Sequence, residues 1–399
     1  MKFSRLTFLP LMVFAATAHA GMPAAQVVNE GGIRFLQSVE KQSSGNICLS
    51  PYSIQSALAM TFAGSDGSTR GQMAEALGFP KNPVDLAGDF QKLDADLAAS
   101  VQVSGSDSTL RVANRLFGAL GFSFRPGFLD LLKEAFSAPL EPLDFKKNPP
   151  LAAEAINHWV EKQTGERIKN LIPPNALTRD TTLVLVNALY FKMPWAEEFP
   201  GAATKPRPFL VGGREKVNVP TMSNTGSLRY LQSQGFTAVG IPFRKGQFQL
   251  LILLPDRQTP SALPTGRFLE ECASLPSAEV SLFLPKFRLE PPTLSLAETL
   301  QSLGMKAAFD IPQGSANFDA MAPRKPDDYL YLSDVFHKTF FALDEKGVEA
   351  AAATAVVMMR ATSMPPDPVE VRVDRPFLFA IQHISSSACL FLGRVTDPR

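Results

Sequence analysis

The sequence predicts an α+β fold in one domain, and the distribution of its apolar patterns indicates this class. Segments with helical spacing concentrate in the first half of the 399-residue chain, whereas strand-like segments dominate the second half. The steady alternation of strand and helix that a doubly wound fold requires is not found. No internal repeat and no obvious linker divides the sequence, so we expect one domain over residues 21–399, preceded by a signal peptide over 1–20.

The composition provides a large core and little net charge. Hydrophobic residues make up 45% of the chain, and the formal net charge is +1. This near-neutral charge gives no electrostatic case for binding nucleic acid or acidic membranes. The three cysteines, Cys48, Cys272 and Cys389, can form at most one disulfide, and each lies in an apolar run. We expect buried free thiols.

The first twenty residues have the pattern of a secretory signal. Lys2 and Arg5 supply the positive charge, 8–16 is apolar, and 18–20 is a small-residue cleavage site. The apolar run is too short for a membrane anchor. The sequence therefore predicts a Sec-type signal peptide and a secreted or periplasmic protein whose mature chain begins at Gly21.

Helical spacing dominates the first half of the domain. It predicts helices over 24–40, 69–77, 83–100, 128–136 and 151–172. A short apolar strand and a further helix share 46–60, with Ser50 placed to cap that helix and Pro51 near its first turn. Strands are expected over 109–117, 140–145 and 182–191. The last of these is a continuous apolar run, which is typical of a central strand buried on both faces.

Strands dominate the second half. They are expected over 217–222, 228–231, 236–242, 249–254, 279–287, 331–343, 369–373, 377–384 and 388–394. One helix, over 294–303, is expected to end at Gly304. A helical turn around 333–337 is an alternative to strand within its segment.

The segment 345–368 carries conflicting local signals. Its alanines favour a helix, its valines and threonine favour a strand, and its prolines are unsuited to either. No charge falls between Glu349 and Arg360, so this part can be buried. As a strand it would place alternate uncharged residues on one face, namely Val348, Ala350, Ala352, Thr354, Val356 and Met358. The alternatives are an Ala-rich surface helix or a linker.

Catalytic and metal-binding motifs are not found in the sequence. It has no zinc-protease, Cys-x-x-Cys, phosphate-loop or nucleophile-elbow pattern, so we expect no enzyme, no metal and no cofactor. A Ser-His-Asp triad could be assembled from Ser50 or Ser53, His337 and Asp334, but no motif supports it. A satisfied core histidine is the simpler interpretation of His337.

Nine residue strings, in order and in approximate spacing, resemble the serpin family. The resemblance covers about 29–398 and includes Glu-Lys-Gly-Val-Glu-Ala-Ala-Ala-Ala-Thr at 345–354. The other strings are 46–53, 113–117, 156–160, 183–192 with Trp195 and Phe199, 284–287, 303–305, 332–338, and 374–379 with 391–395. Each is weak alone, but together they are specific.

The resemblance implies the serpin fold, with three β-sheets, about eight or nine helices and an exposed reactive-centre loop at about 345–368. It implies a metastable, monomeric protease inhibitor of the suicide type. The protein would be a secreted, bacterial-type member of the family. A serine endopeptidase, or alternatively a cysteine endopeptidase, attacks the loop, and the cleaved loop inserts into the main sheet and traps the acyl-enzyme. The alternative is a non-inhibitory serpin that acts as a carrier, a chaperone or a plain protease substrate.

The resemblance also assigns roles to individual residues. Ser50, Ser53, Asn187 and His337 match the family's "shutter", a polar cluster beneath the main sheet that must rearrange when strands part. Trp195 matches the family's "breach", the place where insertion of the loop begins. The inhibitory-type hinge comprises Glu345, Gly347, Val348, Glu349, Ala350, Ala351, Ala352, Ala353 and Thr354. The family's spacing places the reactive bond at Ala361–Thr362, which suits an elastase-like or subtilisin-like protease. Arg360 is the alternative specificity residue, for a trypsin-like protease.

The sequence departs from the family's usual pattern at two places. Val348 stands where many members have Thr or Ser, which leaves the rate of insertion open. The segment 362–373 is longer and richer in proline than in many members, which blurs the position of the reactive bond. In addition, 83–100 lacks a Lys/Arg cluster, so activation of the heparin type through that helix is not expected.

Overall fold

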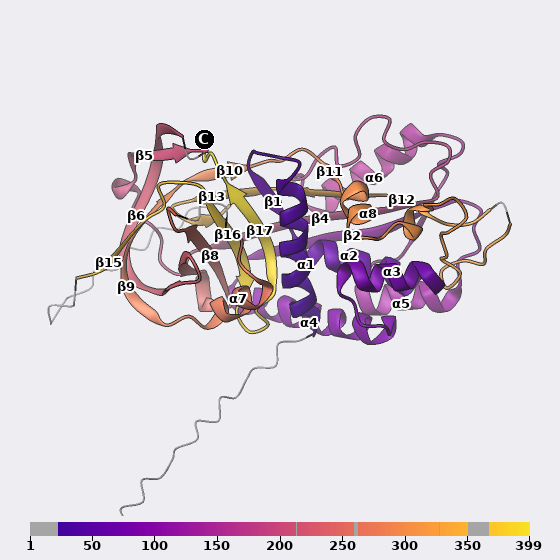
Figure 1. Ribbon diagram of the computed structural model, residues 1–399, viewed down its shortest axis with the longest axis horizontal. Coiled ribbons are helices and arrows are strands. Elements are labelled where there is room, and N and C mark those ends of the chain that lie inside the picture. The colour runs from indigo at the N-terminus through magenta and orange to yellow at the C-terminus, as the bar shows by residue number, and fades with distance from the viewer. Residues whose placement is uncertain (1–22, 213, 259–261, 327, 350–366) are drawn as a thin grey trace, which may run out of the picture.

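Two hydrogen-bonded sheets and a set of mainly N-terminal helices make up the fold (Figure 1). The computed structural model describes residues 23–212, 214–258, 262–326, 328–349 and 367–399. Within these ranges the helices are α1 (Pro23–Glu40), α2 (Pro51–Ala63), α3 (Gly67–Leu77), α4 (Pro83–Ser104), α5 (Pro126–Phe136), α6 (Pro149–Gln163), α7 (Gly266–Glu271) and α8 (Ala297–Ser302). Because α1–α6 precede most of the strands, the expected α+β distribution is confirmed.

The larger sheet has nine strands in the described chain. Its order is β1 (Ile47–Leu49), β17 (Cys389–Val395), β16 (Phe377–His383), β8 (Phe248–Pro255), β7 (Phe236–Pro242), β6 (Glu215–Ser233), β9 (Ser277–Pro285) and β15 (Val369–Arg372), with β5 (Lys205–Val211) paired to β6. The strands expected over 217–222 and 228–231 are one strand, β6. Its first half pairs with β5 and its last residues pair with β7, so β6 joins two groups of strands into one network.

The second sheet, here called the main sheet, has eight strands in the described chain. Its order is β10 (Phe287–Leu289), β13 (Phe341–Asp344), β14 (Gly347–Val348), β4 (Leu183–Pro194), β12 (Leu332–Thr339) and β11 (Leu294–Ser295). In addition, β2 (Thr109–Ala119) pairs with β4 and with β3 (Glu141–Leu143). In Figure 1, α2–α5 lie along one side of the main sheet and α6 lies on the other.

Strand β4 is buried on both faces, as its apolar run predicts. Leu183, Leu185 and Leu189 belong to the large core that includes α1, α2 and α4. Val184 and Val186, which point the other way, belong to a second core with residues of α6. The main sheet is therefore sandwiched, and a strand added beside β4 would enter this covered layer.

The structure corrects three of the expected elements. The helix expected over 151–172 ends at Gln163, because Gly165 (φ 61°) and Glu166 (φ 64°) take the left-handed conformation that ends helices. The helix expected over 294–303 begins as β11 and becomes helical only at Ala297. Residues 333–337 lie in β12, so the alternative helical turn is wrong.

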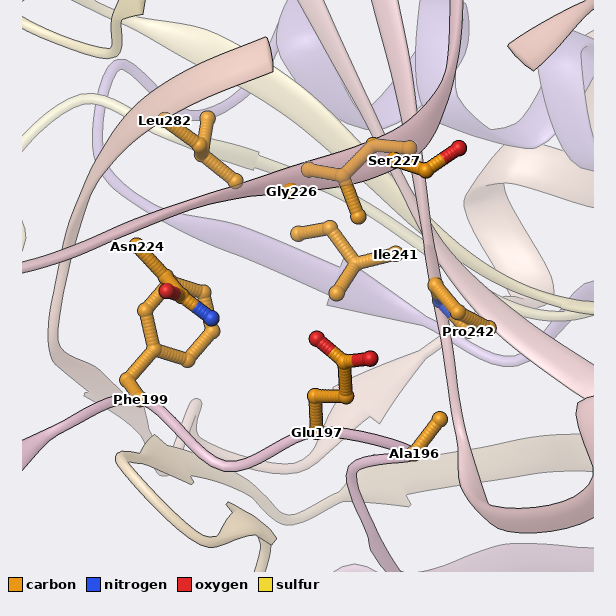
Figure 2. Close-up of a pocket in the computed structure, with 10 residues that line it drawn as sticks. Ala196, Glu197, Phe199, Asn224, Gly226, Ser227, Ile241, Pro242 and Leu282 are labelled. Carbon is orange, nitrogen blue, oxygen red and sulfur yellow. The ribbon is translucent and has the colours of Figure 1, made fainter. Parts of the chain in front are cut away.

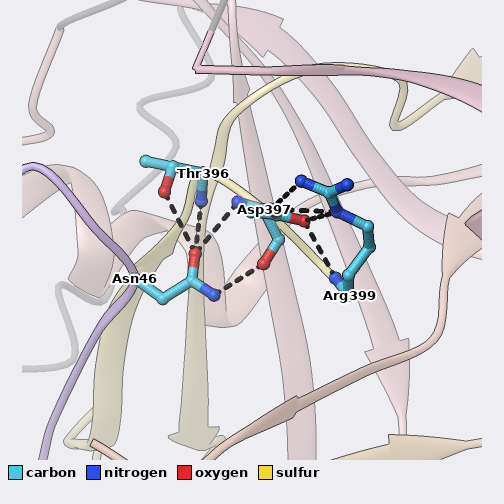
Figure 3. Close-up of polar contacts among 4 residues, drawn as sticks. All are labelled: Asn46, Thr396, Asp397 and Arg399. Atoms are coloured by element: carbon cyan, nitrogen blue, oxygen red, sulfur yellow. Dashed lines mark hydrogen bonds and ion pairs between the residues drawn. The ribbon is translucent and has the colours of Figure 1, made fainter. Parts of the chain in front are cut away.

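Polar contacts fix the C-terminal segment to the chain ahead of β1 (Figure 3). The Asn46 Oδ1 atom accepts hydrogen bonds from the backbone N–H groups of Thr396 and Asp397, at 2.8 and 3.0 Å. Asn46 Nδ2 donates to the Asp397 carbonyl at 2.6 Å, and Asp397 pairs with Arg399. These contacts continue the pairing of β1 with β17 beyond the ends of both strands.

All three cysteines are free and buried, as expected. Burial raises the pKa of Cys48 and of Cys272 to about 12, so both thiols stay protonated and unreactive at neutral pH. None of the helices in the described ranges has both the length and the apolar character needed to cross a membrane.

Candidate functional site

The hinge begins inside the main sheet. Val348 pairs with Leu343 of β13 on one side and with Met193 of β4 on the other. It is buried, with 1% of its surface exposed. Strand β14 therefore already separates β13 from β4 at one end of the sheet. Further along, β4 and β12 pair directly in parallel over Leu183–Leu189, so the sheet is closed there.

Gly347 is required where the hinge enters the sheet. Its φ is 146°, a conformation that residues with a side chain rarely adopt. A Cβ atom at this position would lie 2.2 Å from the carbonyl oxygen of Met193. Only glycine allows the chain to approach β4 this closely.

Glu349 ends the inserted segment in a left-handed turn with φ 51°. Its N–H donates to the Ala342 carbonyl at 3.1 Å, and its carboxylate pairs with Arg167 at 3.3 Å (Nε to Oε2). The side chain of Glu349 is only 9% exposed. Burial and then the neighbouring Glu349 carboxylate raise the pKa of Tyr190 to about 12, which keeps this phenol neutral. We call Arg167, Tyr190 and Glu349 the hinge latch.

Glu345 anchors the other end of the hinge. Its carboxylate accepts hydrogen bonds from Lys286 Nζ at 2.7 Å and from Thr204 Oγ1 at 2.8 Å. Burial alone would raise the pKa of Glu345, but these hydrogen bonds outweigh it and lower the pKa. The backbone also takes part, because the N–H of Phe199 donates to the Glu345 carbonyl at 2.9 Å.

Trp195, the expected breach residue, packs against the start of the hinge. Its indole Nε1–H donates to the Asp344 carbonyl at 3.0 Å, and its backbone N–H donates to the Lys346 carbonyl at 3.0 Å. The ring stacks on Phe243 with centroids 4.6 Å apart and is 2% exposed. Parting the strands here requires both hydrogen bonds to exchange partners.

A small pocket of about 80 Å³ lies beside the breach (Figure 2). The residues that follow Trp195 line one side of it, and β6, β7 and β9 supply the rest. In Figure 2 the Glu197 carboxylate points toward Ile241. The pocket is mostly apolar and has room for little more than a few water molecules.

The four expected shutter residues come together with Asn114. Asn187 Nδ2 donates to Ser53 Oγ at 2.6 Å and to Asn114 Oδ1 at 2.8 Å, and Ser53 Oγ donates to Asn114 Oδ1 at 2.7 Å. His337 Nδ1 is hydrogen-bonded to Asn187 Oδ1. The Ser50 N–H donates to His337 Nε2 at 3.2 Å, so the proton of the imidazole is on Nδ1. We call these five residues the shutter cluster.

The shutter cluster is not a catalytic triad. Burial lowers the pKa of His337 to about 3, so the imidazole is neutral, and its partners are Asn187 and a backbone N–H. The Asp334 carboxylate instead accepts a hydrogen bond from Ser295 at 2.7 Å. The triad considered from the sequence therefore does not assemble. The described ranges contain no group of three or more His, Cys, Asp or Glu that could hold a metal.

Sequence reasoning missed Asn114, Arg167 and Tyr190. Asn114 lies within one of the nine family strings, so its neighbours could have identified it. Arg167 lies in the segment expected to be helical, and its contact with Glu349 has no local signal. The expected hinge residues Ala350–Thr354, the specificity residue Arg360 and the reactive bond Ala361–Thr362 lie outside the described residues.

Comparisons with known proteins agree on one family. The family model described as Serpin (serine protease inhibitor) matches residues 26–398. The leukocyte elastase inhibitor of Bos taurus is 36% identical over 377 residues, which cover 91% of this chain and 96% of that protein. Serpin B6 of Macaca fascicularis is 35% identical over 376 residues, covering 92% and 97%. The crystal structure of Serpin48 from the insect Tenebrio molitor has a TM-score of 0.80 at 30% identity, covering 94% and 98%.

The relatives contradict the expected localisation. The leukocyte elastase inhibitor and serpin B6 are intracellular serpins without signal peptides, so the expectation of a secreted or periplasmic protein is wrong by this comparison. The bacterial type is likewise not supported, because these relatives are eukaryotic. The expectation of secretion depended on the composition of residues 1–20, which lie outside the described ranges.

Proposed function

Since this chain belongs to the serpin family of serine protease inhibitors, we propose that it traps a serine endopeptidase by inserting its cleaved loop into the main sheet. The chain is an inhibitor and not an enzyme. The protease attacks the loop and forms its acyl-enzyme. The segment that follows Val348 then enters the main sheet, with β4 on one side of it and β12 and β13 on the other. One monomeric chain acts on one protease.

The position of β14 is the observation that carries this proposal. Val348 already has strand partners on both sides, so the next residues can continue the same ladder without a new nucleation step. The alternate positions Ala350, Ala352 and Thr354 are small or uncharged, and each can be buried when the strand extends. We infer that Val348 is compatible with insertion, because it is already buried as a strand residue.

Insertion has a defined path through the groups described above. The hinge latch must open first, because Glu349 is held in a left-handed conformation beside Arg167 and cannot extend strand β14 until its backbone becomes extended. Beyond the latch, β4 and β12 must separate, and the His337–Asn187 hydrogen bond joins these two strands. The shutter cluster therefore controls how far the new strand can advance. Buried polar groups that lose partners cost about 1–3 kcal/mol each, so they must find new ones.

The reactive bond is proposed at Ala361–Thr362, from the family's spacing counted from Glu345. Alanine suits the small apolar specificity pocket of an elastase-like or subtilisin-like protease, and the relative named leukocyte elastase inhibitor supports this class. Arg360 would suit a trypsin-like pocket that contains a carboxylate, which is the alternative target class. A cysteine endopeptidase remains the other alternative.

A gel assay with purified elastase, subtilisin and trypsin tests the function. A trapped acyl-enzyme gives a band that resists SDS and has the summed mass of protease and loop-cleaved inhibitor. The same proteases with their nucleophilic serine chemically blocked are the control and must give no such band. Complete cleavage of the chain by all three proteases without any stable band would contradict inhibition by trapping and favour the non-inhibitory alternative.

Mass spectrometry of the C-terminal fragment released from the complex tests the reactive bond. A fragment that begins at Thr362 supports the proposed bond, and one that begins at Ala361 moves it to Arg360–Ala361. A fragment that begins outside 359–365 would show that the loop has been counted wrongly.

A further inference from the structure

Two arginines stack on one phenylalanine on the face of the larger sheet formed by β5, β6, β9 and β15. Arg372 pairs directly with Phe283 across β15 and β9, and its Cζ atom lies 4.6 Å from the centroid of the Phe283 ring. Arg207 reaches the same ring from β5, with its Cζ atom 4.4 Å from the centroid. Phe283 is half-buried, whereas its neighbours Leu282 and Leu284 are fully buried, so this face is turned toward solvent. We call Arg207, Phe283 and Arg372 the arginine site.

One positive charge of the arginine site has no partner. Arg372 donates two hydrogen bonds to the Glu370 carboxylate, at 2.6 and 2.7 Å. Arg207 forms no ion pair within the described residues, and its Nε atom is buried without a hydrogen-bond partner. The hydrogen bonds from Arg372 lower the pKa of Glu370, and the nearby charge of Arg207 acts in the same direction. Two guanidinium groups therefore share one carboxylate.

A hollow of about 90 Å³ is lined by both arginines of the site. Thr221 and Asp374 also line it. The Asp374 carboxylate is already paired with Arg257 at 2.8 Å and with Arg375 at 2.9 Å, so it does not neutralise Arg207. The hollow has room for a carboxylate group but is too small for a drug-sized ligand, whose sites begin at about 300 Å³.

The arginine site is prepared to bind a carboxylate. Stacking on an aromatic ring holds the plane of a guanidinium group while its N–H edge stays available, so little side-chain freedom is lost on binding. The segments outside the described ranges contain a single acidic residue, Asp327. Its neighbour Asp328 precedes β12, which begins beside Leu183 at the closed end of the main sheet. The carboxylate must therefore come from another molecule.

The arginine site lies beside the end of the reactive-centre loop. Residues 362–368 connect the proposed reactive bond to Val369, the first residue of β15, and span at most about 25 Å when fully extended. A protease domain of about 230 residues has a radius of gyration of about 17 Å and hence a diameter of roughly 45 Å. A protease bound at the reactive bond is therefore wide enough to cover β15.

We propose that the arginine site binds a carboxylate on the surface of the target protease, outside the cleft that holds the loop. The inhibitor thereby favours proteases with an acidic surface beside the active site. Charge pairs at the rim of an interface act mainly on the rate of association, so the site selects among proteases before the loop is cut. This inference rests on attack of the loop by a protease, which is part of the proposed function, but not on the trapping that follows.

The rates at which anionic and cationic trypsin attack the loop test the arginine site. The two enzymes share a preference for arginine, here Arg360, and differ in surface charge. The measured quantity is the second-order rate constant for loss of the intact chain, which counts trapping and plain cleavage together. Arg207→Glu is expected to slow anionic trypsin at least about threefold at low salt, and cationic trypsin should not be slowed. The difference should disappear in 1 M salt, where charges are screened within about 3 Å.

The matched control is Lys133→Glu, which makes the same change in net charge at an exposed position of α5. This helix lies at the other end of the molecule from β15 (Figure 1). Melting curves check that each variant is folded. If Arg207→Glu does not fold, Arg207→Gln, which removes the charge without reversing it, decides by the same comparison.

The outcomes separate docking from inhibition. Equal rates of attack by anionic trypsin on wild type and on the Arg207 variant, or an equal loss of rate in Lys133→Glu, overturn the arginine site. Slowing that appears only in the Arg207 variant and only at low salt supports it. Rapid attack that ends in cleavage without a stable complex would contradict trapping but would leave the arginine site intact.

Discussion

Gly347 and Glu349 enclose the short segment of the hinge that is already in the sheet. The glycine admits the chain beside Met193, and the glutamate ends the insertion at a left-handed turn fastened to Arg167. Between them, Val348 contributes a buried side chain and strand hydrogen bonds. At this scale, the readiness for insertion comes from the geometry of three consecutive residues.

Gly347→Ala tests the entry to the sheet. The added methyl group would meet the Met193 carbonyl, and an alanine at φ 146° is strained in any case, so β14 should not form. We expect a loss of about 1–3 kcal/mol and a melting temperature lower by a few degrees, with more of the chain cleaved as a substrate. The control is Gly71→Ala in α3, where a Cβ meets nothing within 4 Å. An unchanged melting temperature and unchanged trapping for Gly347→Ala would contradict this role.

His337 makes the stability of the fold depend on pH. Its pKa in the folded state is lowered to about 3, so between that value and its ordinary pKa of 6.5 the unfolded chain binds the extra proton. The contribution of His337 is therefore complete above about pH 6.5 and is lost as the pH falls toward 3, at about 1.4 kcal/mol per pH unit. Burial lowers the pKa of His383 to about 4, so His383 also reduces the stability of the fold as the pH falls. Burial raises the pKa of Asp94 to about 6, so Asp94 has the opposite effect on stability.

His337→Gln should make the melting temperature depend less steeply on pH between 6.5 and 4. The exposed His158 on α6 provides the control, because His158→Gln should leave the profile of the wild type unchanged. Melting curves at half-unit steps of pH give both slopes. A slope for His337→Gln as steep as that of the wild type would show that this histidine is not held neutral in the folded state.

The residues of the site differ in how far the sequence could reveal them. Ser50, Ser53, Asn187 and His337 lie in family strings, and the structure places them in contact. Arg167 and Tyr190 reach the hinge from separate segments. Their contact with Glu349 depends on the packing of the whole sheet, which no local pattern encodes.

At the scale of secondary-structure elements, the hinge is an incomplete strand of the main sheet. Strand β14 has two residues, whereas its neighbour β4 has twelve. The chain beyond Val348 therefore has a template along which to lengthen. The charge-free run between Glu349 and Arg360 is the part of the sequence suited to fill it.

Thr354→Arg tests the burial of this added strand. On insertion, residue 354 would share the inward face of Val348, so the arginine would bring an unpaired charge into the core at a cost of several kcal/mol. The variant should be cleaved at the normal rate but should no longer trap the protease, and Ala352→Arg should behave in the same way. The matched control is Thr354→Val, which keeps an uncharged side chain of similar size on the same face and should still trap the protease. Undiminished trapping by Thr354→Arg would contradict the insertion of the loop.

The elements themselves were predicted well where one apolar pattern decided them. The central strand β4 and the amphipathic helix α1 are examples, because the whole pattern lies within the element. The segment after Gln163 was predicted to be helical because Ile168 and Leu171 keep the apolar spacing. Their burial is real, but the left-handed residues 165 and 166 end the helix, and spacing alone carries no information about backbone conformation.

At the scale of the whole molecule, the main sheet is open at one end and closed at the other. The hinge separates β13 from β4 at the breach, while the shutter cluster holds β4 against β12. Such an arrangement gains hydrogen bonds and buried area if the loop enters. The intact chain is therefore expected to be a kinetically retained state rather than the most stable one.

Thermal unfolding before and after cleavage of the loop tests this account most directly. Cleavage anywhere within 355–364 frees the hinge to insert as a strand of roughly ten residues, and at about 1 kcal/mol per ladder hydrogen bond this adds on the order of 10 kcal/mol. The cleaved wild type should melt at least 10 °C above the intact chain, on the order expected for such a gain. Cleaved Thr354→Arg, in which full insertion is blocked, should gain much less. Equal melting temperatures for intact and cleaved wild type would contradict insertion of the loop into the main sheet.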